Sequence, residues 1–134
     1  MAMKVLLVED EAALADVIGR NLRARGHSVT LAPTAEAALL NLAAERPDVL
    51  LLDVNLPDMT GWEILRRLGE DDRRHLPVVV ISAAPISPKR IEEFRPARCL
   101  MKPFPIDALL RTLSDLNAPS QPADPSDVPP RGAA

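Results

Sequence analysis

The sequence contains one cysteine, no tyrosine, two phenylalanines and one tryptophan among its 134 residues. Because Cys99 is the only cysteine, the chain cannot form an internal disulfide, and a disulfide-stapled secreted fold is excluded. No apolar run is long enough to span a membrane, and the first residues lack the pattern of a secretory signal peptide. These features predict a reducing, cytoplasmic setting.

An excess of basic residues is also missing. Sixteen Lys and Arg residues face nineteen Asp and Glu residues, which gives a net charge of −3. Direct binding to nucleic acid or to an anionic membrane is therefore not expected. Four arginines lie among acidic residues and predict a solvated mixed-charge surface, namely Arg66, Arg67, Arg73 and Arg74. His27 and His75 have no cysteine or carboxylate at ligand spacing, so no zinc site is predicted.

Short apolar runs alternate with segments of helical period from Met3 to about Leu116, which is typical of a parallel sheet with helices on both faces. Residues 5–8, 49–52 and 78–81 are continuously apolar, as expected of central strands. Residues 27–31 and 98–101 are mixed in polarity and predict strands nearer the edges. The expected fold class is therefore α/β, with a doubly wound, five-stranded parallel sheet.

Apolar residues at helical spacing predict five helices. They are expected between Glu11 and Gly26, between Thr34 and Arg46, around residues 64–68, over residues 88–94 and over residues 106–116. The fourth is short because the window from Pro85 to Pro96 contains three prolines, the two ends included. Residues 118–134 have little to bury and predict a flexible, Pro/Ala-rich tail after a single domain of residues 1–117.

The notable polar residues fall at the carboxyl ends of the predicted strands, where an open parallel sheet binds ligands. They are Glu9, Asp10, Asp53, Ser82 and Lys102. Two carboxylates about 4 Å apart repel by roughly 4 kcal/mol at an effective dielectric near 20, so a cation should offset the acidic group. Oxygen ligands favour Mg²⁺.

A carboxylate can also act as a nucleophile toward phosphorus and form an aspartyl phosphate. Phosphoryl transfer mainly needs positioning and neutralisation of charge. In this interpretation Asp53 attacks, Mg²⁺ and Lys102 neutralise the phosphoryl oxygens, and the Ser82 hydroxyl bonds one of them.

Four segments, taken in order, resemble the response-regulator receiver domain of two-component signalling over all of the chain except the tail. They are Val8-Glu9-Asp10-Glu11, residues 52–61 (LDVNLPDMTG), Ile81-Ser82-Ala83 and Lys102-Pro103-Phe104. The resemblance implies a flavodoxin-like fold with strand order 2-1-3-4-5 and a cis bond before Pro103. It assigns Glu9 and Asp10 as the acidic pair, Asp53 as phosphoacceptor, the Asn55 backbone carbonyl as a ligand of Mg²⁺ or Mn²⁺, Ser82 as the switch hydroxyl and Lys102 as the phosphate partner.

The same resemblance implies a stand-alone receiver that takes its phosphoryl group from a histidine kinase or a histidine phosphotransfer protein. Phosphorylation would then alter binding to an unidentified downstream protein. The chain would not be an enzyme beyond its own phosphorylation and slow dephosphorylation. The resemblance also allows a dimer through the face of the fourth helix, fifth strand and fifth helix.

One position departs from the family. Receivers usually carry an aromatic switch residue three positions before the lysine, and Cys99 stands there, predicted as a small buried side chain. This departure and the proline-broken fourth helix leave open an alternative, a constitutive interaction module that phosphorylation does not switch.

Two other classes fit less well. A haloacid-dehalogenase-like phosphatase would need a second aspartate where Asn55 stands. A flavin-binding protein would need a phosphate loop in place of the acidic segment Glu9-Asp10-Glu11.

Overall fold

The computed structural model describes residues 2–117 and contains five strands and six helices within them. The strands are β1 (Lys4–Val8), β2 (Ser28–Ala32), β3 (Val49–Asp53), β4 (Val78–Ser82) and β5 (Arg98–Met101). The helices are α1 (Ala12–Ala24), α2 (Ala35–Ala44), α3 (Gly61–Leu68), α4 (Glu70–Arg74), α5 (Pro88–Phe94) and α6 (Ile106–Asn117). The predicted tail, residues 118–134, lies outside the described residues.

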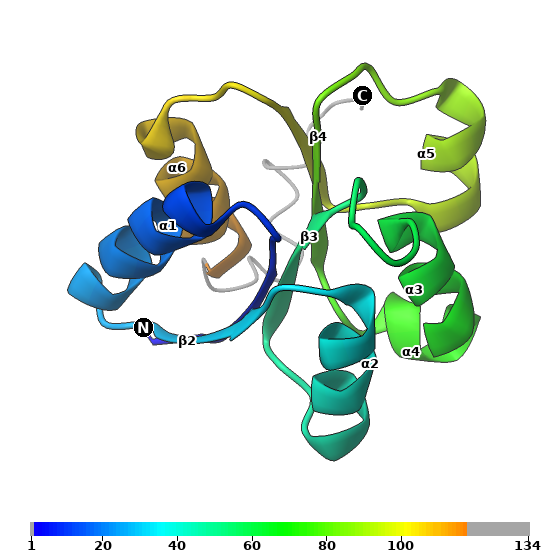
Figure 1. Cartoon of the computed structure of the whole chain (residues 1–134), viewed down its shortest axis with the longest axis horizontal. Helices are drawn as coiled ribbons and strands as arrows, with labels where there is room; N and C mark the ends of the chain where they lie inside the picture. The colour runs from blue at the N-terminus through cyan, green and yellow to red at the C-terminus, as the bar shows by residue number, and fades with distance from the viewer. Residues whose placement is uncertain (1, 118–134) are drawn as a thin grey trace, which may run out of the picture.

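All five strands pair in parallel in one sheet, in the order β2-β1-β3-β4-β5 (Figure 1). The predicted fold class and strand order are therefore confirmed. The chain moves outward from β1 to β2 and then returns past β1 to β3, so the order of strands reverses between β1 and β3. Ligand sites of such sheets lie at this reversal, beyond the carboxyl ends of the strands.

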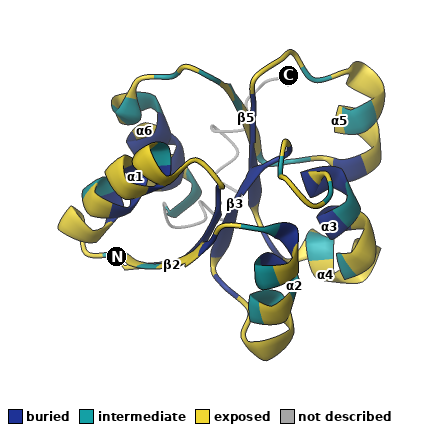
Figure 2. Cartoon of the chain, in the orientation of Figure 1, coloured by how far each residue is buried: buried dark blue, intermediate teal, exposed yellow. Residues whose placement is uncertain are grey.

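Helices cover both faces of the sheet. Figures 1 and 2 show α1 and α6 on one face and α2, α3 and α5 on the other. Alternate residues of the central strands point into two separate cores: Leu7 and Leu51 join the core under α1 and α6, while Leu6 and Leu50 join the opposite one. Burial on both faces explains why the three central runs are continuously apolar. The predicted edge strands, β2 and β5, carry several exposed residues.

Several helix ends follow local signals in the sequence. Thr34 accepts a hydrogen bond from the backbone N–H of Ala37 and caps α2, and Ser87 caps α5 just before Pro88. Gly26 follows α1 with a φ of +91°, a conformation that glycine adopts without strain. The short helix predicted over residues 88–94 matches α5.

The prediction of five helices is wrong by one. The additional helix, α4, is a five-residue segment between Gly69 and His75 that contains only acidic and basic residues. Because it buries no side chain, it has no apolar periodicity from which it could be predicted. Among residues 2–117, no helix is long and apolar enough to cross a membrane.

Candidate functional site

The predicted site residues lie at the carboxyl edge of the sheet. Asp53 and Ser82 are the last residues of β3 and β4, Glu9 follows β1, and Lys102 follows β5. Parallel pairing aligns these ends, since Val8 pairs with Leu52 and Ser82 with Met101. Asp53 and Glu9 are each only 1% exposed. The fold thus buries two carboxylates side by side at the point where the strand order reverses.

The Lys102 ammonium joins these carboxylates. Its Nζ lies 2.9 Å from Asp53 Oδ2 and 3.2 Å from Glu9 Oε2, and Glu11 Oε1 lies 3.6 Å away. Partial burial would lower the pKa of Lys102, but the hydrogen bond to Asp53 and the negative charges of Glu9 and Asp53 outweigh burial and raise it. Lys102 is therefore a fully charged counterion at neutral pH. The peptide bond between Lys102 and Pro103 is cis, as expected.

Glu9 is the least satisfied group of the site. Its Oε2 accepts hydrogen bonds from the backbone N–H of Glu11, at 3.1 Å, and from Lys102. Its Oε1 is buried and has no hydrogen-bond partner among the described residues. Burial and the adjacent charge of Asp53 raise the pKa of Glu9 to about 7. A buried carboxylate oxygen without a partner is a ready position for a bound cation.

Asp10 completes an acidic group that could hold a metal ion. One carboxylate oxygen from each of Glu9, Asp10 and Asp53 lies within 4.8 Å of the others, and Asp10 is exposed to solvent. All three donors are hard oxygens, and one Glu9 oxygen has no hydrogen-bond partner in the described part of the chain, so the residues present fit a cation such as Mg²⁺. A hollow of about 350 Å³ opens beside Asp10 and is lined by residues 54–60, the β3–α3 loop.

The β3–α3 loop is closed at its base. Asn55 and Thr60 form an antiparallel bridge, and the backbone N–H of Gly61 donates to the carbonyl oxygen of Val54 at 3.0 Å. The backbone N–H of Asn55 donates to Asp53 Oδ1 at 2.8 Å. Both oxygens of the Asp53 carboxylate are therefore held in place, one by Lys102 and one by the loop. The assignment of the Asn55 carbonyl as a metal ligand stays a prediction.

Gly61 brings α3 against the end of β3. A Cβ atom at this position would lie 2.9 Å from the carbonyl oxygen of Asp53 and 2.9 Å from Val54 Cα, closer than real Cβ atoms come. We expect Gly61→Ala to lower the free energy of unfolding by about 1–3 kcal/mol, because the backbone at Asp53 and Val54 must move to make room for the methyl group. Urea denaturation measures the change.

Gly19→Ala is the matched control, since its Cβ would meet only the mobile end of the Arg23 side chain. Alanine suits a helix interior better than glycine, so this variant should be neutral or more stable. Equal stability of Gly61→Ala and the wild type would show that the contact between α3 and β3 adjusts freely.

Ser82 is turned toward its own loop. Its hydroxyl donates to the Ala84 carbonyl oxygen at 2.6 Å and accepts from the Ala84 N–H at 3.1 Å. The side chain lies at the edge of the site and is only 5% exposed, but both of these hydrogen bonds are to Ala84. In this conformation the hydroxyl is not engaged with Asp53 or Lys102.

The expectation that Cys99 is buried is wrong. Cys99 is exposed on β5, an edge strand of the sheet that pairs with β4 alone among residues 2–117. Side chains on an edge strand are covered only if a helix lies over them, and sequence position alone does not show whether one does.

Two of the three aromatic residues form a contact that the sequence did not reveal. The rings of Trp62 on α3 and Phe94 on α5 stack with centroids 5.3 Å apart. The guanidinium groups of Arg66 and Arg73 lie over Phe94, and that of Arg90 lies over Trp62. The mixed-charge surface predicted for this region is therefore partly a packed junction.

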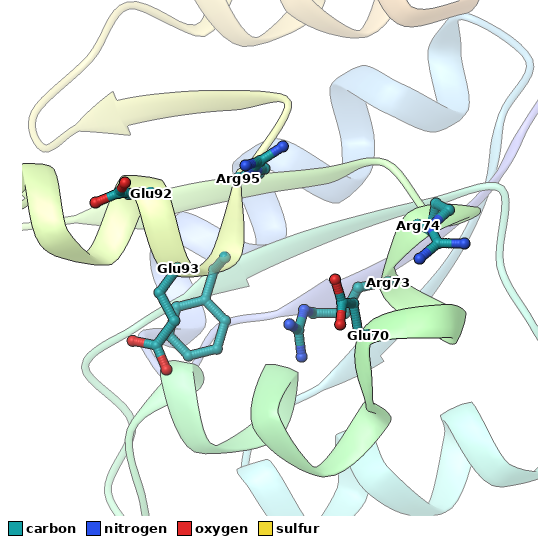
Figure 3. A pocket seen from close by; sticks show the side chains of 7 residues that line it. Glu70, Arg73, Arg74, Glu92, Glu93 and Arg95 are labelled. Atoms are coloured by element: carbon teal, nitrogen blue, oxygen red, sulfur yellow. The ribbon is translucent and has the colours of Figure 1, made fainter.

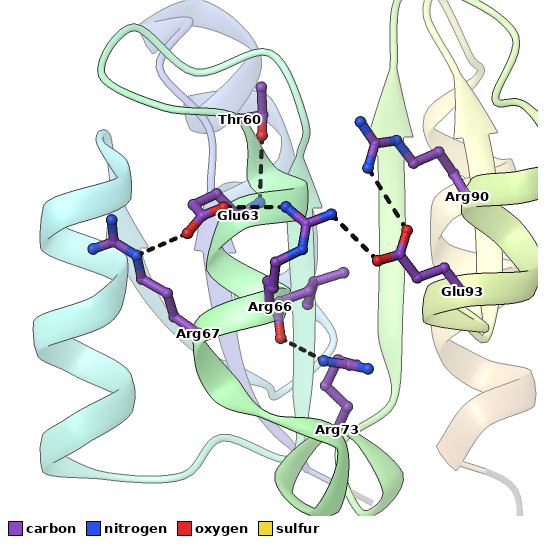
Figure 4. A network of polar contacts seen from close by, with 8 residues as sticks. Thr60, Glu63, Arg66, Arg67, Arg73, Arg90 and Glu93 are labelled. Carbon is purple, nitrogen blue, oxygen red and sulfur yellow. Dashed lines mark hydrogen bonds and ion pairs between the residues drawn. The ribbon is translucent and has the colours of Figure 1, made fainter.

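Ion pairs cross the same junction (Figure 4). Arg66 bonds both Glu63 and Glu93, and Arg73 donates to the carbonyl oxygen of Leu65. Beside it, a hollow of about 440 Å³ opens between α4 and α5 (Figure 3). It is lined by Glu70, Arg73, Arg74, Glu92, Glu93, Phe94 and Arg95, and none of these belongs to the predicted site.

Comparison with known proteins agrees with this geometry. Residues 5–114 match the model of the response regulator receiver domain family. The chain is 33% identical over 129 residues to the response regulator MprA of Mycobacterium tuberculosis, an alignment that covers 92% of this chain and 54% of that protein. It is 40% identical over 112 residues to the response regulator protein FleR of Pseudomonas aeruginosa, covering 82% of this chain and 24% of the relative. The chain thus spans about half, or less, of the length of these relatives.

Solved structures share the fold. The chemotaxis response regulator CheY4 of Vibrio cholerae superposes with a TM-score of 0.79 at 26% identity, covering 87% of this chain and 99% of that one. A CheY-like receiver domain protein from Methanospirillum hungatei gives a TM-score of 0.77 at 24% identity, with 86% and 93% covered. The match of residues 5–114 to the family model shows that the chain belongs to the response regulator receiver domain family of two-component systems.

Proposed function

We propose that this receiver accepts a phosphoryl group on Asp53 with a bound Mg²⁺ ion. The observation that carries the proposal is the Asp53 carboxylate, which is buried at the end of β3 with Lys102 Nζ 2.9 Å from Oδ2 and two further acidic residues beside it. This arrangement combines a nucleophile, a fixed cation and a group of hard oxygen ligands.

The chain's own residues would divide the work. An oxygen of Asp53 forms the new bond to phosphorus while the bond between phosphorus and the donor histidine nitrogen breaks. Lys102 is already placed to neutralise a phosphoryl oxygen, and the Ser82 hydroxyl can exchange its bond to Ala84 for one to the phosphoryl group. Glu9, Asp10, Asp53 and the Asn55 carbonyl would hold Mg²⁺ or Mn²⁺, which supplies further positive charge for the transferred group.

The donor and the output are part of the same proposal. A histidine kinase or a histidine phosphotransfer protein in the cytoplasm would supply the phosphoryl group, and a downstream protein would bind differently after phosphorylation. Beyond its own phosphorylation and slow dephosphorylation, the domain would catalyse no reaction. The proposed dimer face comprises α5, β5 and α6.

Intact mass spectrometry tests the acceptor chemistry. The protein is incubated with MgCl₂ and a small-molecule phosphodonor, and we expect an adduct of one phosphoryl group on the wild type. The adduct should be absent in Asp53→Asn, because an amide is a poor nucleophile, and absent without metal.

Asp16→Asn is the matched control, since Asp16 lies on α1 in an exposed ion pair with Arg20. This variant should be phosphorylated like the wild type. An adduct that persists in Asp53→Asn would contradict the proposed acceptor. Absence of an adduct with every donor tried, histidine kinases included, would favour the constitutive interaction module.

A further inference from the structure

We propose that Asp58 is a positioning residue, whose carboxylate ties the β3–α3 loop to the first turn of α2 and thereby holds Asn55 beside the acidic group. The metal-binding part of this inference rests on the proposed function, in which the Asn55 carbonyl is a ligand. The mechanical part rests on hydrogen bonds alone.

Asp58 bonds α2 with both carboxylate oxygens. Oδ1 accepts from the backbone N–H of Ala35 at 2.9 Å, and Oδ2 accepts from that of Glu36 at 3.0 Å. The first N–H groups of a helix have no partner within the helix, so a carboxylate bonded to two of them is held firmly. These hydrogen bonds, with that of Ala35 first, lower the pKa of Asp58. The helix is thus capped in part by a residue from a different loop.

The loop has few other connections. Its base is closed by the Asn55–Thr60 bridge, and Leu56 and Met59 pack partly against the core. At the first residue of the loop, the backbone N–H of Val54 donates to the carbonyl oxygen of Ile81 on β4. Beyond it, within residues 2–117, the two bonds of Asp58 are the only hydrogen bonds that join residues 55–60 to an element other than β3 and α3. The outer side of the loop borders the hollow beside Asp10. Without Asp58, the tip of the loop would therefore gain freedom.

The tie also relates two sides of the acidic site. The backbone N–H of Glu9 donates to the carbonyl oxygen of Ala32, the last residue of β2, at 3.1 Å. Thr34, two residues after Ala32, caps α2, and Asp58 is bonded to the first turn of the same helix. Glu9 is thus bonded to the last residue of β2, and the loop that carries Asn55 is bonded to the first turn of α2, which begins three residues later. Outer contacts of this kind tune the affinity of a metal site by orienting its ligands.

Thr34 provides a control that separates the tie from the cap. Its Oγ1 accepts from the N–H of Ala37, so Thr34→Val removes one capping bond of α2 and neither of the two bonds to Asp58. Asp58→Ala uncaps the same turn and also releases the loop. Asp58→Asn keeps one acceptor oxygen and should fall between the wild type and Asp58→Ala.

The experiment measures two quantities for the wild type and these variants. Calorimetric titration with MgCl₂ should give an affinity about tenfold weaker for Asp58→Ala, but within about twofold of the wild type for Thr34→Val. Amide hydrogen exchange without metal should be faster over residues 55–60 in Asp58→Ala and unchanged there in Thr34→Val.

The outcomes separate this inference from the proposed function. The inference would be overturned if Asp58→Ala changed neither the hydrogen exchange of residues 55–60 nor the affinity for Mg²⁺. It would also be overturned if Thr34→Val changed both quantities as much as Asp58→Ala does. If the wild type does not bind Mg²⁺, the proposed metal site fails, and hydrogen exchange alone tests whether Asp58 holds the loop. Faster exchange over residues 55–60 in the Asp58 variants only would support this role. Equal exchange there in the wild type and all variants would overturn it.

Discussion

Replacing Lys102 with methionine is expected to lower the free energy of unfolding at pH 8, without metal, by about 3 kcal/mol. Lys102 is the cation between Asp53 and Glu9, which are both almost fully buried. Without it, two adjacent carboxylates remain in a poorly solvated site, and this costs more than the lost ion pair itself. Urea denaturation in a chelating buffer measures the change.

The loss of stability in Lys102→Met should depend on pH and on bound metal. Below pH 7 Glu9 takes up a proton, so the destabilisation should be smaller at pH 6 than at pH 8. Saturating Mg²⁺ should restore part of the stability, since a ligand that binds only the folded state stabilises it.

Lys89→Met is the matched control for Lys102→Met. Lys89 is exposed on α5, and its removal should change stability by less than about 0.5 kcal/mol. Equal stability of Lys102→Met and the wild type at pH 8 would show that solvent reaches the carboxylates well enough to replace the lysine.

Glu9→Gln should have the opposite effect and raise the free energy of unfolding at pH 8, without metal, by about 2–3 kcal/mol. The pKa of Glu9 is about 7 in the folded protein, above its ordinary value of 4.5, because burial disfavours the charged form. Between these two values the folded state binds more protons than the unfolded state. Stability is therefore lost as the pH rises from about 4.5 to about 7, and the full penalty is present above 7.

Glutamine removes the penalty, so the advantage of the variant should shrink as the pH falls and vanish near 4.5. Urea denaturation across this pH range measures it. Glu11→Gln serves as the control, since the Glu11 side chain is 62% exposed and its change should stay below about 0.5 kcal/mol at each pH. A Glu9→Gln variant that is less stable than the wild type at pH 8 would show that the ionised bond to Lys102 outweighs the cost of burial.

The same variant should bind Mg²⁺ more weakly, because a neutral amide replaces a charged ligand.

The sequence by itself determined the sheet and the position of the acidic site. Continuous apolar runs predict strands that are buried on both faces, and the residue after such a run must lie at the carboxyl edge of a parallel sheet. The runs that end before Glu9 and Asp53 therefore place these two residues at one edge, because backbone pairing aligns the ends of parallel strands, while Lys102 follows the weaker, mixed run of residues 98–101. Thr34 and Ser87 are similarly local signals, since a cap acts within four residues.

Only the tertiary structure decided the features that depend on distant neighbours. Glu9 has a carboxylate oxygen without a hydrogen-bond partner among residues 2–117 and a raised pKa, and both follow from how deeply the packed fold buries that carboxylate. The exposure of Cys99 depends on which helices cover an edge strand, and the stacking of Trp62 on Phe94 depends on the approach of α5 to α3. The tie from Asp58 to α2 joins residues more than 20 positions apart. Local pattern carries no information about such contacts, because they form only when separate elements pack against one another.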